Sequence, residues 1–169
     1  MIKVKIQKIN EDAIIPEYAH ESDAGMDMFS AKEMIIMPRH RALIPTGIQV
    51  EIPKGYEMQI RPKSGLALRE GITVLNTPGT VDSDYRGEVG VILINHSSKP
   101  YKVEKGQKIG QAVFNKIEKA KFVQEKLSKT KRGEGGFGST GLKHEKKGFL
   151  HHKKPTKTQL RTNFSRVYS

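Results

Sequence analysis

Apolar and polar residues alternate in several short stretches along the chain. The alternating positions are Ile2, Val4 and Ile6; Ile48, Val50 and Ile52; Tyr56, Met58 and Ile60; Val89, Val91 and Leu93; and Ile109, Gln111 and Val113. A period of two residues is typical of a half-buried β-strand, because successive side chains point to opposite faces of a sheet. The pattern therefore predicts many short strands, of which these five are the clearest.

Turn-forming residues separate these stretches, in the segments 53–55, 77–79, 83–87, 96–100 and 104–106. They are rich in Gly, Pro, Asp and Ser, which favour turns. No window keeps the i, i+3, i+4, i+7 apolar spacing of a helix over three turns, and the best helix candidate is the short segment GLALREG at 65–71. Many short strands joined by turns predict an all-β fold, such as a sandwich, a jelly roll or a barrel.

The length and composition limit the class of protein. The chain has 169 residues, and we expect one compact domain plus extensions. It has no cysteine, which excludes disulfides and thiolate zinc sites and fits a reducing cytosol. The first ten residues alternate charged and apolar types, and apolar runs such as VILI at 91–94 are far too short to span a bilayer. These features predict a cytoplasmic protein with neither a secretory signal nor a membrane segment.

The net charge of +12 is unevenly distributed along the chain. Residues 142–169 contain eight Lys and Arg against Glu145 alone, so this tail carries +7 and the first 141 residues carry +5. Its apolar residues are too sparse for a core, and Pro155 and the lysine pairs favour disorder. Two interpretations stay open: a solvated extension, or an electrostatic arm that binds nucleic acid weakly through phosphate contacts.

The glycine-rich segment RGEGGFGSTG at 132–141 is similar to two phosphate-binding patterns. Its glycines form G-x-G-x-x-G, but no strand and helix flank them and no acid follows about 20 residues on, as a dinucleotide-binding turn requires. A Walker A loop needs Lys after Gly138, where this chain has Ser139. Unhindered amides, two hydroxyls and Arg132 still suit a phosphate, and a plain linker would gain nothing from Phe137.

Four other segments combine glycine, acids and hydroxyls where turns are expected: SDAGMD at 22–27, RPKSGLA at 61–67, NTPGTVDSDYRGE at 76–88 and GQKIGQAVF at 106–114. With RGEGGFGSTG they stand in the order of the five motifs of the homotrimeric, all-β deoxyuridine triphosphatase (dUTPase) family, which the chain resembles over residues 1–141. The resemblance implies a jelly-roll-like β-clip domain at 1–131, a flexible C-terminal lid at 132–141 and a homotrimer. It implies hydrolysis of dUTP to dUMP and pyrophosphate, which keeps uracil out of DNA and supplies dUMP for thymidylate synthesis.

The resemblance assigns Asp82 as the catalytic residue. A carboxylate within about 3 Å of the attacking water can act as general base at the α-phosphorus, although Asp82 taken alone would be a turn-forming residue. The residues that the resemblance places against uracil and deoxyribose are Asn76, Gly79, Val81, Tyr85 and Phe137. The Asn76 amide can pair with a uracil edge, the Tyr85 ring excludes a 2′-hydroxyl, and Phe137 stacks on the base. The tight hairpin leaves no room for the 5-methyl group of thymine.

The phosphate contacts implied by the resemblance are Lys63, Ser64, Gly65, Gln111, Arg132, Gly138, Ser139 and Thr140. Taken alone, Gln111 would be a polar strand residue that shares one face with Ile109 and Val113. The family has arginine before the serine, where this chain has Lys63, which keeps the charge but loses the planar fork. Whether Lys63 or Arg61 takes that role stays open.

The resemblance assigns Asp27 to a Mg²⁺ ion, which the carboxylate would orient through water while the metal bridges the phosphates. Mg²⁺ keeps several waters and needs few protein ligands, so one carboxylate suffices. Taken alone, Asp27 would be a turn or surface acid, and the sequence has no other acidic cluster with metal-ligand spacing.

Two other functions stay open. The dCTP deaminases share the fold, but Tyr85 and Phe137 favour a dUTPase. A regulatory or nucleic-acid-binding protein could act through the basic tail, but there is no insertion between Asn95 and Gly106 to form a regulatory surface.

Overall fold

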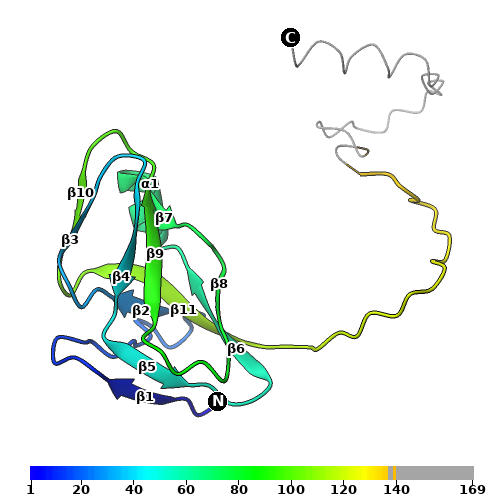
Figure 1. Cartoon of the computed structure of the whole chain (residues 1–169), viewed down its shortest axis with the longest axis horizontal. Helices are drawn as coiled ribbons and strands as arrows, with labels where there is room; N and C mark the ends of the chain where they lie inside the picture. The colour runs from blue at the N-terminus through cyan, green and yellow to red at the C-terminus, as the bar shows by residue number, and fades with distance from the viewer. Residues whose placement is uncertain (137–138, 140–169) are drawn as a thin grey trace, which may run out of the picture. The chain divides into compact units, whose positions relative to one another are not determined.

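The structure is a computed structural model and describes residues 1–136 and 139. Within these residues the chain forms eleven β-strands and one helix (Figure 1). The elements are β1 (Lys5–Lys8), β2 (Met26–Phe29), β3 (Met34–Ile36), β4 (Arg41–Pro45), β5 (Ile48–Glu51), β6 (Tyr56–Arg61), α1 (Ser64–Glu70), β7 (Ile72–Val74), β8 (Gly79–Val81), β9 (Gly90–Asn95), β10 (Tyr101–Val103) and β11 (Lys108–Lys116). The predicted all-β fold is confirmed.

The strands pair antiparallel in four small sheets. One sheet has four strands in the order β2, β11, β6, β8, and a second has three in the order β4, β9, β7. The other two sheets are the pairs β1–β5 and β10–β3. The four-stranded sheet carries most of the candidate site, because β2, β11, β6 and β8 each contribute or lead into a residue that the resemblance singles out.

One hydrophobic core joins the sheets. Alternate residues of β6 and β9, such as Met58, Ile60, Val91 and Leu93, are almost fully buried. They belong to the same cluster of packed side chains as Val74 of β7. Burial of such a cluster is the main favourable term in folding, so the core fixes the positions of the strand ends that carry the site.

The predicted strands over β5, β6, β9 and β11 are confirmed, and so is the short helix, as α1. The strand expected from Ile2 begins only at Lys5, and all four residues of β1 are exposed. The prediction missed β2, β3, β4, β7, β8 and β10. These strands have three to five residues, too few for an alternating pattern to be distinguished from a turn.

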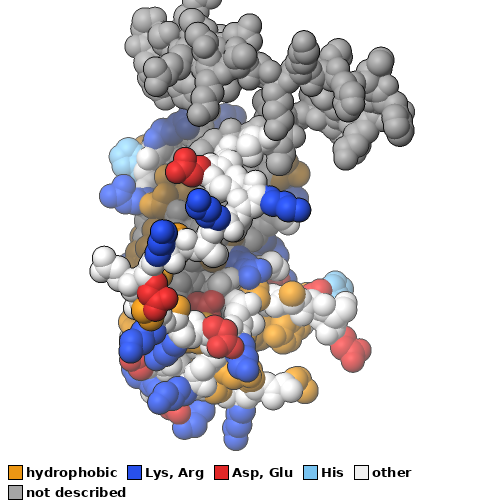
Figure 2. Space-filling model, turned by 90° about the vertical axis from the view of Figure 1, so that its right-hand side faces the viewer, with side chains coloured by type: hydrophobic (Ala, Val, Ile, Leu, Met, Phe, Trp, Pro, Cys, Tyr) orange, Lys and Arg blue, Asp and Glu red, His pale blue; other side chains and the backbone are white. Residues whose placement is uncertain are grey.

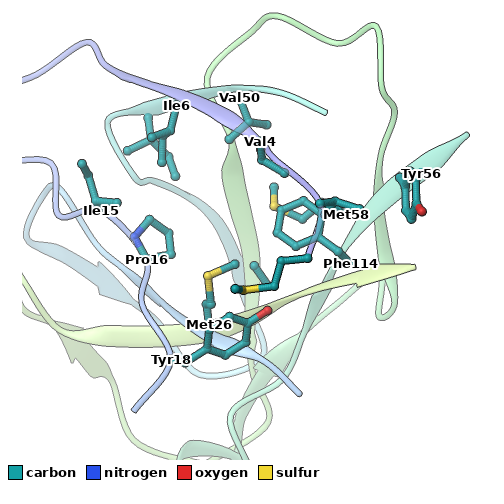
Figure 3. Close-up of a pocket in the computed structure, with 14 residues that line it drawn as sticks. Val4, Ile6, Ile15, Pro16, Tyr18, Met26, Val50, Tyr56, Met58 and Phe114 are labelled. Carbon is teal, nitrogen blue, oxygen red and sulfur yellow. The ribbon is translucent and has the colours of Figure 1, made fainter. Parts of the chain in front are cut away.

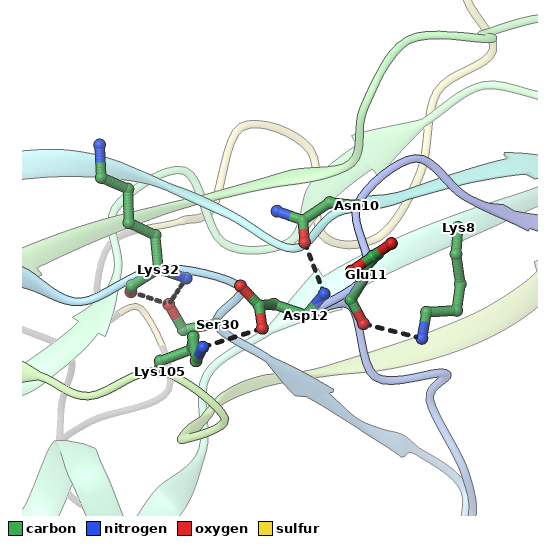
Figure 4. A network of polar contacts seen from close by, with 7 residues as sticks. All are labelled: Lys8, Asn10, Glu11, Asp12, Ser30, Lys32 and Lys105. Carbon is green, nitrogen blue, oxygen red and sulfur yellow. Dashed lines mark hydrogen bonds and ion pairs between the residues drawn. The ribbon is translucent and has the colours of Figure 1, made fainter.

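One ion pair holds the loop after β1 against the loop before β11, and other polar contacts lie within single loops (Figure 4). Lys105 Nζ lies 2.8 Å from Asp12 Oδ1, and the Asp12 amide donates to Asn10 Oδ1 at 2.6 Å. The Ser30 hydroxyl donates to the Lys32 carbonyl at 2.5 Å. The Lys105–Asp12 pair is about half exposed on both sides. Exposed ion pairs add little stability, so these contacts mainly define loop geometry.

Charged side chains cover much of the surface. Lys and Arg are spread over the face shown in Figure 2, with Asp and Glu among them. Within the part of the chain that the structure describes, no helix is both long and apolar enough to cross a membrane.

Candidate active site

Asp27 is a buried acid on β2, with 5% of its surface exposed. Lys63 Nζ lies 2.8 Å from its Oδ1 atom and Lys108 Nζ lies 2.7 Å from its Oδ2 atom. Each carboxylate oxygen therefore faces one ammonium group. The interpretation of Asp27 as a turn or surface acid is wrong, because the residue belongs to a strand and is covered by two lysines.

The two lysines keep Asp27 ionised. Burial raises the pKa of Asp27, but the hydrogen bonds from Lys108 and Lys63 and their positive charges together lower it by more, so the pKa lies below its usual value. The hydrogen bond from Lys108 to Asp27 also raises the pKa of Lys108. Two ammonium groups and one carboxylate leave a net positive charge, which suits an anion.

The segment that joins β6 to α1 adds donors next to Lys63. Lys63 is the N-cap residue of α1, and Ser64 and Gly65 are the first two helical residues. The Ala67 amide donates to the Lys63 carbonyl at 3.1 Å, and amides before it have no intrahelical acceptor. The Arg69 guanidinium lies over Gly65, where a Cβ atom would be 2.8 Å from Nη2. A hydroxyl, free amides and two cations are therefore close to one another.

Gln111 lies on β11 between β2 and β6, opposite Asp27 and Arg61. It therefore joins the same group as Lys63 and Ser64. Arg61, the alternative cation, donates from Nε and Nη2 to Gln59 Oε1 at 3.1 and 2.7 Å. Lys63 therefore contacts another candidate site residue, whereas Arg61 contacts Gln59.

A β-bulge determines which way Gln111 points. The pairing of β11 with β2 shifts register between Lys108 and Gly110. Ile109 is 1% exposed and belongs to the core, and Gly110 is buried beside it, whereas Gln111 is only half-buried. The expectation that Ile109 and Gln111 share one face is wrong, because the bulge inserts an extra residue into the alternation.

The second group of candidate residues lies on the loop that follows β8. Asp82 comes directly after Val81, the last residue of β8, and its side chain is exposed. The Tyr85 amide donates to the Asp82 carbonyl at 3.2 Å, which closes the turn. Val81, Asp82 and Tyr85 line a pocket of about 240 Å³ together with Leu43 and other residues. The structure thus brings the proposed base and the sugar-reading tyrosine to one pocket.

Asn76 and Gly79 lie next to each other where the chain enters β8. A Cβ atom on Gly79 would be 3.0 Å from Asn76 Nδ2, so glycine at this position leaves room for the amide. The expectation that all of 77–79 is a turn is wrong for its last residue, because Gly79 begins β8. Asn76 itself is exposed, and its amide is therefore accessible to a base.

The two groups lie toward opposite ends of β6. Val81 pairs with Met58, so Asp82 continues past it toward Glu57, whereas Gln111 pairs with Arg61. Four residues separate Glu57 from Arg61, or roughly 13 Å at about 3.3 Å per strand residue. Within one chain, Asp82 and the Lys63–Ser64–Gln111 group are therefore not neighbours.

The predicted lid is described only in part. The Arg132 guanidinium donates from Nε to the Gly135 carbonyl at 2.7 Å, and the Ser139 amide donates to the Gly136 carbonyl at 3.0 Å. Phe137, Gly138, Thr140 and the tail 142–169 lie outside the described residues. Residues Met1–Lys121 form one compact unit, and the lid belongs to a second one that begins at Phe122.

The larger pocket of the domain is a different place. Its volume is about 500 Å³, and apolar side chains such as Ile15, Met26, Met58 and Phe114 line it (Figure 3). None of the candidate site residues belongs to this lining. An apolar lining suits a polar triphosphate poorly, so pocket size by itself does not point to the candidate residues.

The sequence analysis missed three residues of the site. Lys108 pairs with Asp27 although 81 positions separate them, and spacing cannot reveal such a contact. Arg69 covers Gly65, and its separation of four residues within a predicted helix could have indicated this. Gly87 lies against the Tyr85 ring, and no pattern distinguishes it from an ordinary turn glycine.

The implied metal does not have a preformed protein cage. Among residues 1–136 and 139, no three His, Asp or Glu side chains gather closely enough to hold an ion. Asp27 is the assigned ligand, but both of its oxygens accept lysine ammonium groups. Asp27 therefore does not fit direct coordination as it stands.

The domain thus belongs to the class of all-β proteins, with lysines and a hydroxyl toward one end of β6 and an exposed acidic turn toward the other. Comparisons with known proteins identify the family within this class. A family model described as dUTPase matches residues 11–141. The chain belongs to the dUTPase family.

Relatives and solved structures agree with this assignment. The deoxyuridine 5′-triphosphate nucleotidohydrolase of Alkaliphilus metalliredigens is 57% identical over 144 residues, which cover 85% of this chain and 100% of the relative. That of Clostridium tetani is 58% identical over 139 residues, covering 82% and 96%. The dUTPase of Staphylococcus bacteriophage 80alpha, solved with dUPNHPP, is 28% identical with a TM-score of 0.76, covering 84% of this chain and 100% of that one. The tail 142–169 lies beyond the family match.

Proposed function

We propose that this chain hydrolyses dUTP to dUMP and pyrophosphate by attack of water on the α-phosphorus. Membership of the dUTPase family and relatives named as nucleotidohydrolases support the activity. The observation that carries the mechanism is the exposed Asp82 in one pocket with Tyr85. An exposed carboxylate can accept a proton from water, and phosphoryl transfer depends mainly on positioning.

Asp82 is the proposed general base in this scheme. Water attacks the α-phosphorus as its proton passes to the carboxylate, the bond between the α-phosphorus and the bridging oxygen breaks, and pyrophosphate leaves. Asn76 and Gly79 read the uracil edge, and Val81 lies against the nucleoside. Tyr85 covers the deoxyribose, and Phe137 stacks on the base. A hairpin that fits uracil this closely leaves no space for a 5-methyl group.

The proposed phosphate contacts come from the group around Asp27. Lys63, Ser64, Gly65 and Gln111 offer an ammonium group, a hydroxyl, a free amide and a side-chain amide. Lys108 adds a second ammonium group on the same carboxylate. The remaining contacts are proposed for the lid, and they are Arg132, Gly138, Ser139 and Thr140. A lid that closes on the γ-phosphate keeps bulk water out of the site and leaves the attacking water in place.

The proposed metal is Mg²⁺ bound to the phosphates. Mg²⁺ keeps several waters and takes few protein ligands, so the lack of an acidic cluster among the described residues is no obstacle. When bound, the ion would neutralise phosphate charge. Each Asp27 oxygen accepts one lysine ammonium group and keeps a second lone pair, so the carboxylate could still accept a hydrogen bond from a metal-bound water.

The proposed assembly is a homotrimer with sites shared between subunits. The outer face of β4 and β9 carries Leu43, which is 61% exposed and lies opposite Ile92. Leu75 follows β7 on the same sheet and is 43% exposed. Leu43 and Ile92 also line the pocket of Asp82 and Tyr85. A neighbour packed on this face would cover apolar surface and could bring its own Ser64 and Gln111 to Asp82.

A second function is proposed for the tail. Eight Lys and Arg against one acid in residues 142–169 suit weak phosphate binding. Removal of residues 142–169 should abolish salt-sensitive retention on heparin or DNA and leave dUTP hydrolysis unchanged. Absence of retention of the full chain at about 50 mM salt would contradict this function.

The proposed location is the cytoplasm, where nucleotides for DNA synthesis are made in bacteria.

A panel of nucleoside triphosphates tests the proposed function. The full chain with Mg²⁺ should release pyrophosphate from dUTP, and far more slowly from UTP, dTTP and dCTP. Ammonia release from dCTP would instead identify a deaminase. Equal rates on all four nucleotides, or no pyrophosphate from any, would contradict the proposal.

A further inference from the structure

The ring of Tyr85 folds back over the backbone of Gly87. The Tyr85 hydroxyl donates to the Glu88 carbonyl at 3.0 Å. A Cβ atom placed on Gly87 would lie 2.5 Å from Cζ and 3.0 Å from Cε2 of that ring, and it would also clash with the hydroxyl oxygen. Real Cβ atoms do not approach other atoms this closely, because the interior packs at van der Waals distances. Only glycine leaves the space that this position of the ring needs.

The rest of the ring faces the candidate site. Tyr85 is 45% exposed, and it lines the pocket of about 240 Å³ that also contains Asp82. One side of the ring is therefore fixed against the chain while another side is available to a nucleotide. A displacement of the Tyr85 ring would therefore change the shape of this pocket.

The acceptor of the tyrosine hydroxyl is itself held in place. The Glu88 carboxylate accepts the Gly47 amide at 2.7 Å, which ties the hairpin to the start of β5. The next residue is fixed too, because the Thr46 hydroxyl donates to the Val89 carbonyl. Arg86 secures the turn by donating from Nη1 to the Ser83 and Tyr85 carbonyls, both at 2.8 Å. Hydrogen bonds thus hold the backbone on both sides of Gly87, and we expect a side chain at position 87 to displace the half-exposed ring more than the backbone.

We infer that Gly87 is a specificity-determining positioning residue, which holds the Tyr85 ring where it excludes a 2′-hydroxyl. The inference rests on the proposed role of Tyr85 in reading the sugar. Gly87 touches neither substrate nor reacting atoms. It acts only by allowing the ring to lie flat on the hairpin, so its effect must depend on the presence of the ring.

A double-mutant cycle tests this dependence. The kcat/KM values for dUTP and UTP are measured for the wild type, Gly87→Ala, Tyr85→Ala and the double variant. Gly87→Ala should lower the dUTP to UTP ratio by roughly tenfold, the scale of discrimination that pocket shape provides. The double variant should have the ratio of Tyr85→Ala alone. Ser83→Ala in the same turn is the matched control and should keep the wild-type ratio.

A spectroscopic readout makes the inference independent of the activity. The NMR signals of ¹³C-labelled tyrosine, assigned to Tyr85 by its substitution, should shift in Gly87→Ala while urea unfolding stays near wild type. Tyr85→Phe supplies a variant without added bulk: it loses the bond to Glu88 and should show a smaller fall in the ratio.

Several results would overturn the inference. One is an unchanged Tyr85 NMR signal in Gly87→Ala. Another is a wild-type dUTP to UTP ratio in Gly87→Ala although Tyr85→Ala has lost discrimination. The last is an equal effect of Gly87→Ala on this ratio with and without the Tyr85 ring. A wild type that does not discriminate dUTP from UTP, or Tyr85→Ala with an unchanged ratio, would instead contradict the proposed sugar reading.

Discussion

Asp27 and Asp82 are the same residue type in opposite environments. Asp27 is buried, and both of its oxygens accept lysine ammonium groups. Asp82 is exposed in the turn after β8. An acid held between two lysines is suited to position cations, whereas an accessible acid is suited to take a proton. The two environments support the proposed roles of Asp27 near the phosphates and of Asp82 as the base.

The first prediction concerns Asp82→Asn. The amide keeps the size of the carboxylate but cannot accept the proton, so kcat should fall by roughly 10² or more, as expected for loss of a general base. Binding of a non-hydrolysable dUTP analogue should stay within a few-fold. Steady-state kinetics and calorimetry measure the two quantities. Asp84→Asn, two residues along the same turn, is the control, and equal kcat values for Asp82→Asn and wild type would rule out the assignment.

The second prediction concerns the pH dependence of stability at Asp27. The lysines hold its pKa in the folded protein below the usual value of 3.8. A lowered pKa adds stability that is fully present above pH 3.8 and is lost as the pH falls through the lower, folded-state pKa. The difference in unfolding free energy between wild type and Asp27→Asn should therefore be constant around neutral pH and shrink below 3.8.

Urea unfolding at several pH values measures this difference. Asp12→Asn is the matched control, because Asp12 also pairs with a lysine but is 49% exposed. An exposed pair contributes little, so its difference should be small at every pH. A difference for Asp27→Asn that grows as the pH falls would contradict the assigned environment.

At the scale of elements, the sequence predicted the strands that show several alternations but not the short ones. The segment SDAGMD was interpreted as a turn, because Gly, Asp and Ser favour turns. In the structure it runs into β2, and Gly25 lies against β11, where a Cβ atom would be 3.3 Å from both Gln111 Cβ and Val113 Cγ2. Glycine at this position lets the segment before β2 pack closely against β11. Composition alone does not distinguish such a packing glycine from a turn glycine.

The candidate site was predictable to a similar extent. The motif residues were found through the family resemblance, and the structure places Asp27, Lys63 and Gln111 close to one another. The pairing of Lys108 with Asp27 and the bulge beside it could not be predicted. Both depend on the register of two strands, and a shift of one residue moves side chains to the other face.

The third prediction concerns the lid. A chain that ends at Lys131 should fold normally but hydrolyse dUTP poorly, because it lacks the proposed γ-phosphate contacts and closure. Circular dichroism and pyrophosphate release measure the two properties. The chain that lacks only residues 142–169 is the control and should keep full activity. In the full chain, Phe137→Trp should show quenched fluorescence when a dUTP analogue binds; full activity after truncation and an unchanged spectrum would mean that 132–141 is a linker.

At the scale of the whole molecule, the register of β6 separates Asp82 from Gln111 within one chain. The fourth prediction follows from a site shared between subunits. Asp82→Asn and Gln111→Ala should each be poorly active. Refolding an equal mixture of the two variants should restore roughly a quarter of wild-type activity. In such a mixture, about one site in four takes an intact Asp82 from one subunit and an intact Gln111 from its neighbour. Refolding each variant alone is the control. Mixtures no more active than the separate variants would place both residues in the same chain's site.

The fate of the water oxygen tests the central claim most directly, since the mechanism states which phosphorus is attacked. We would let the full chain hydrolyse dUTP with Mg²⁺ in water enriched in ¹⁸O and analyse both products by mass spectrometry. The account predicts one ¹⁸O atom in dUMP and none in pyrophosphate, because water adds to the α-phosphorus and pyrophosphate leaves with its bridging oxygen. Label in pyrophosphate, or release of inorganic phosphate with dUDP, would contradict it.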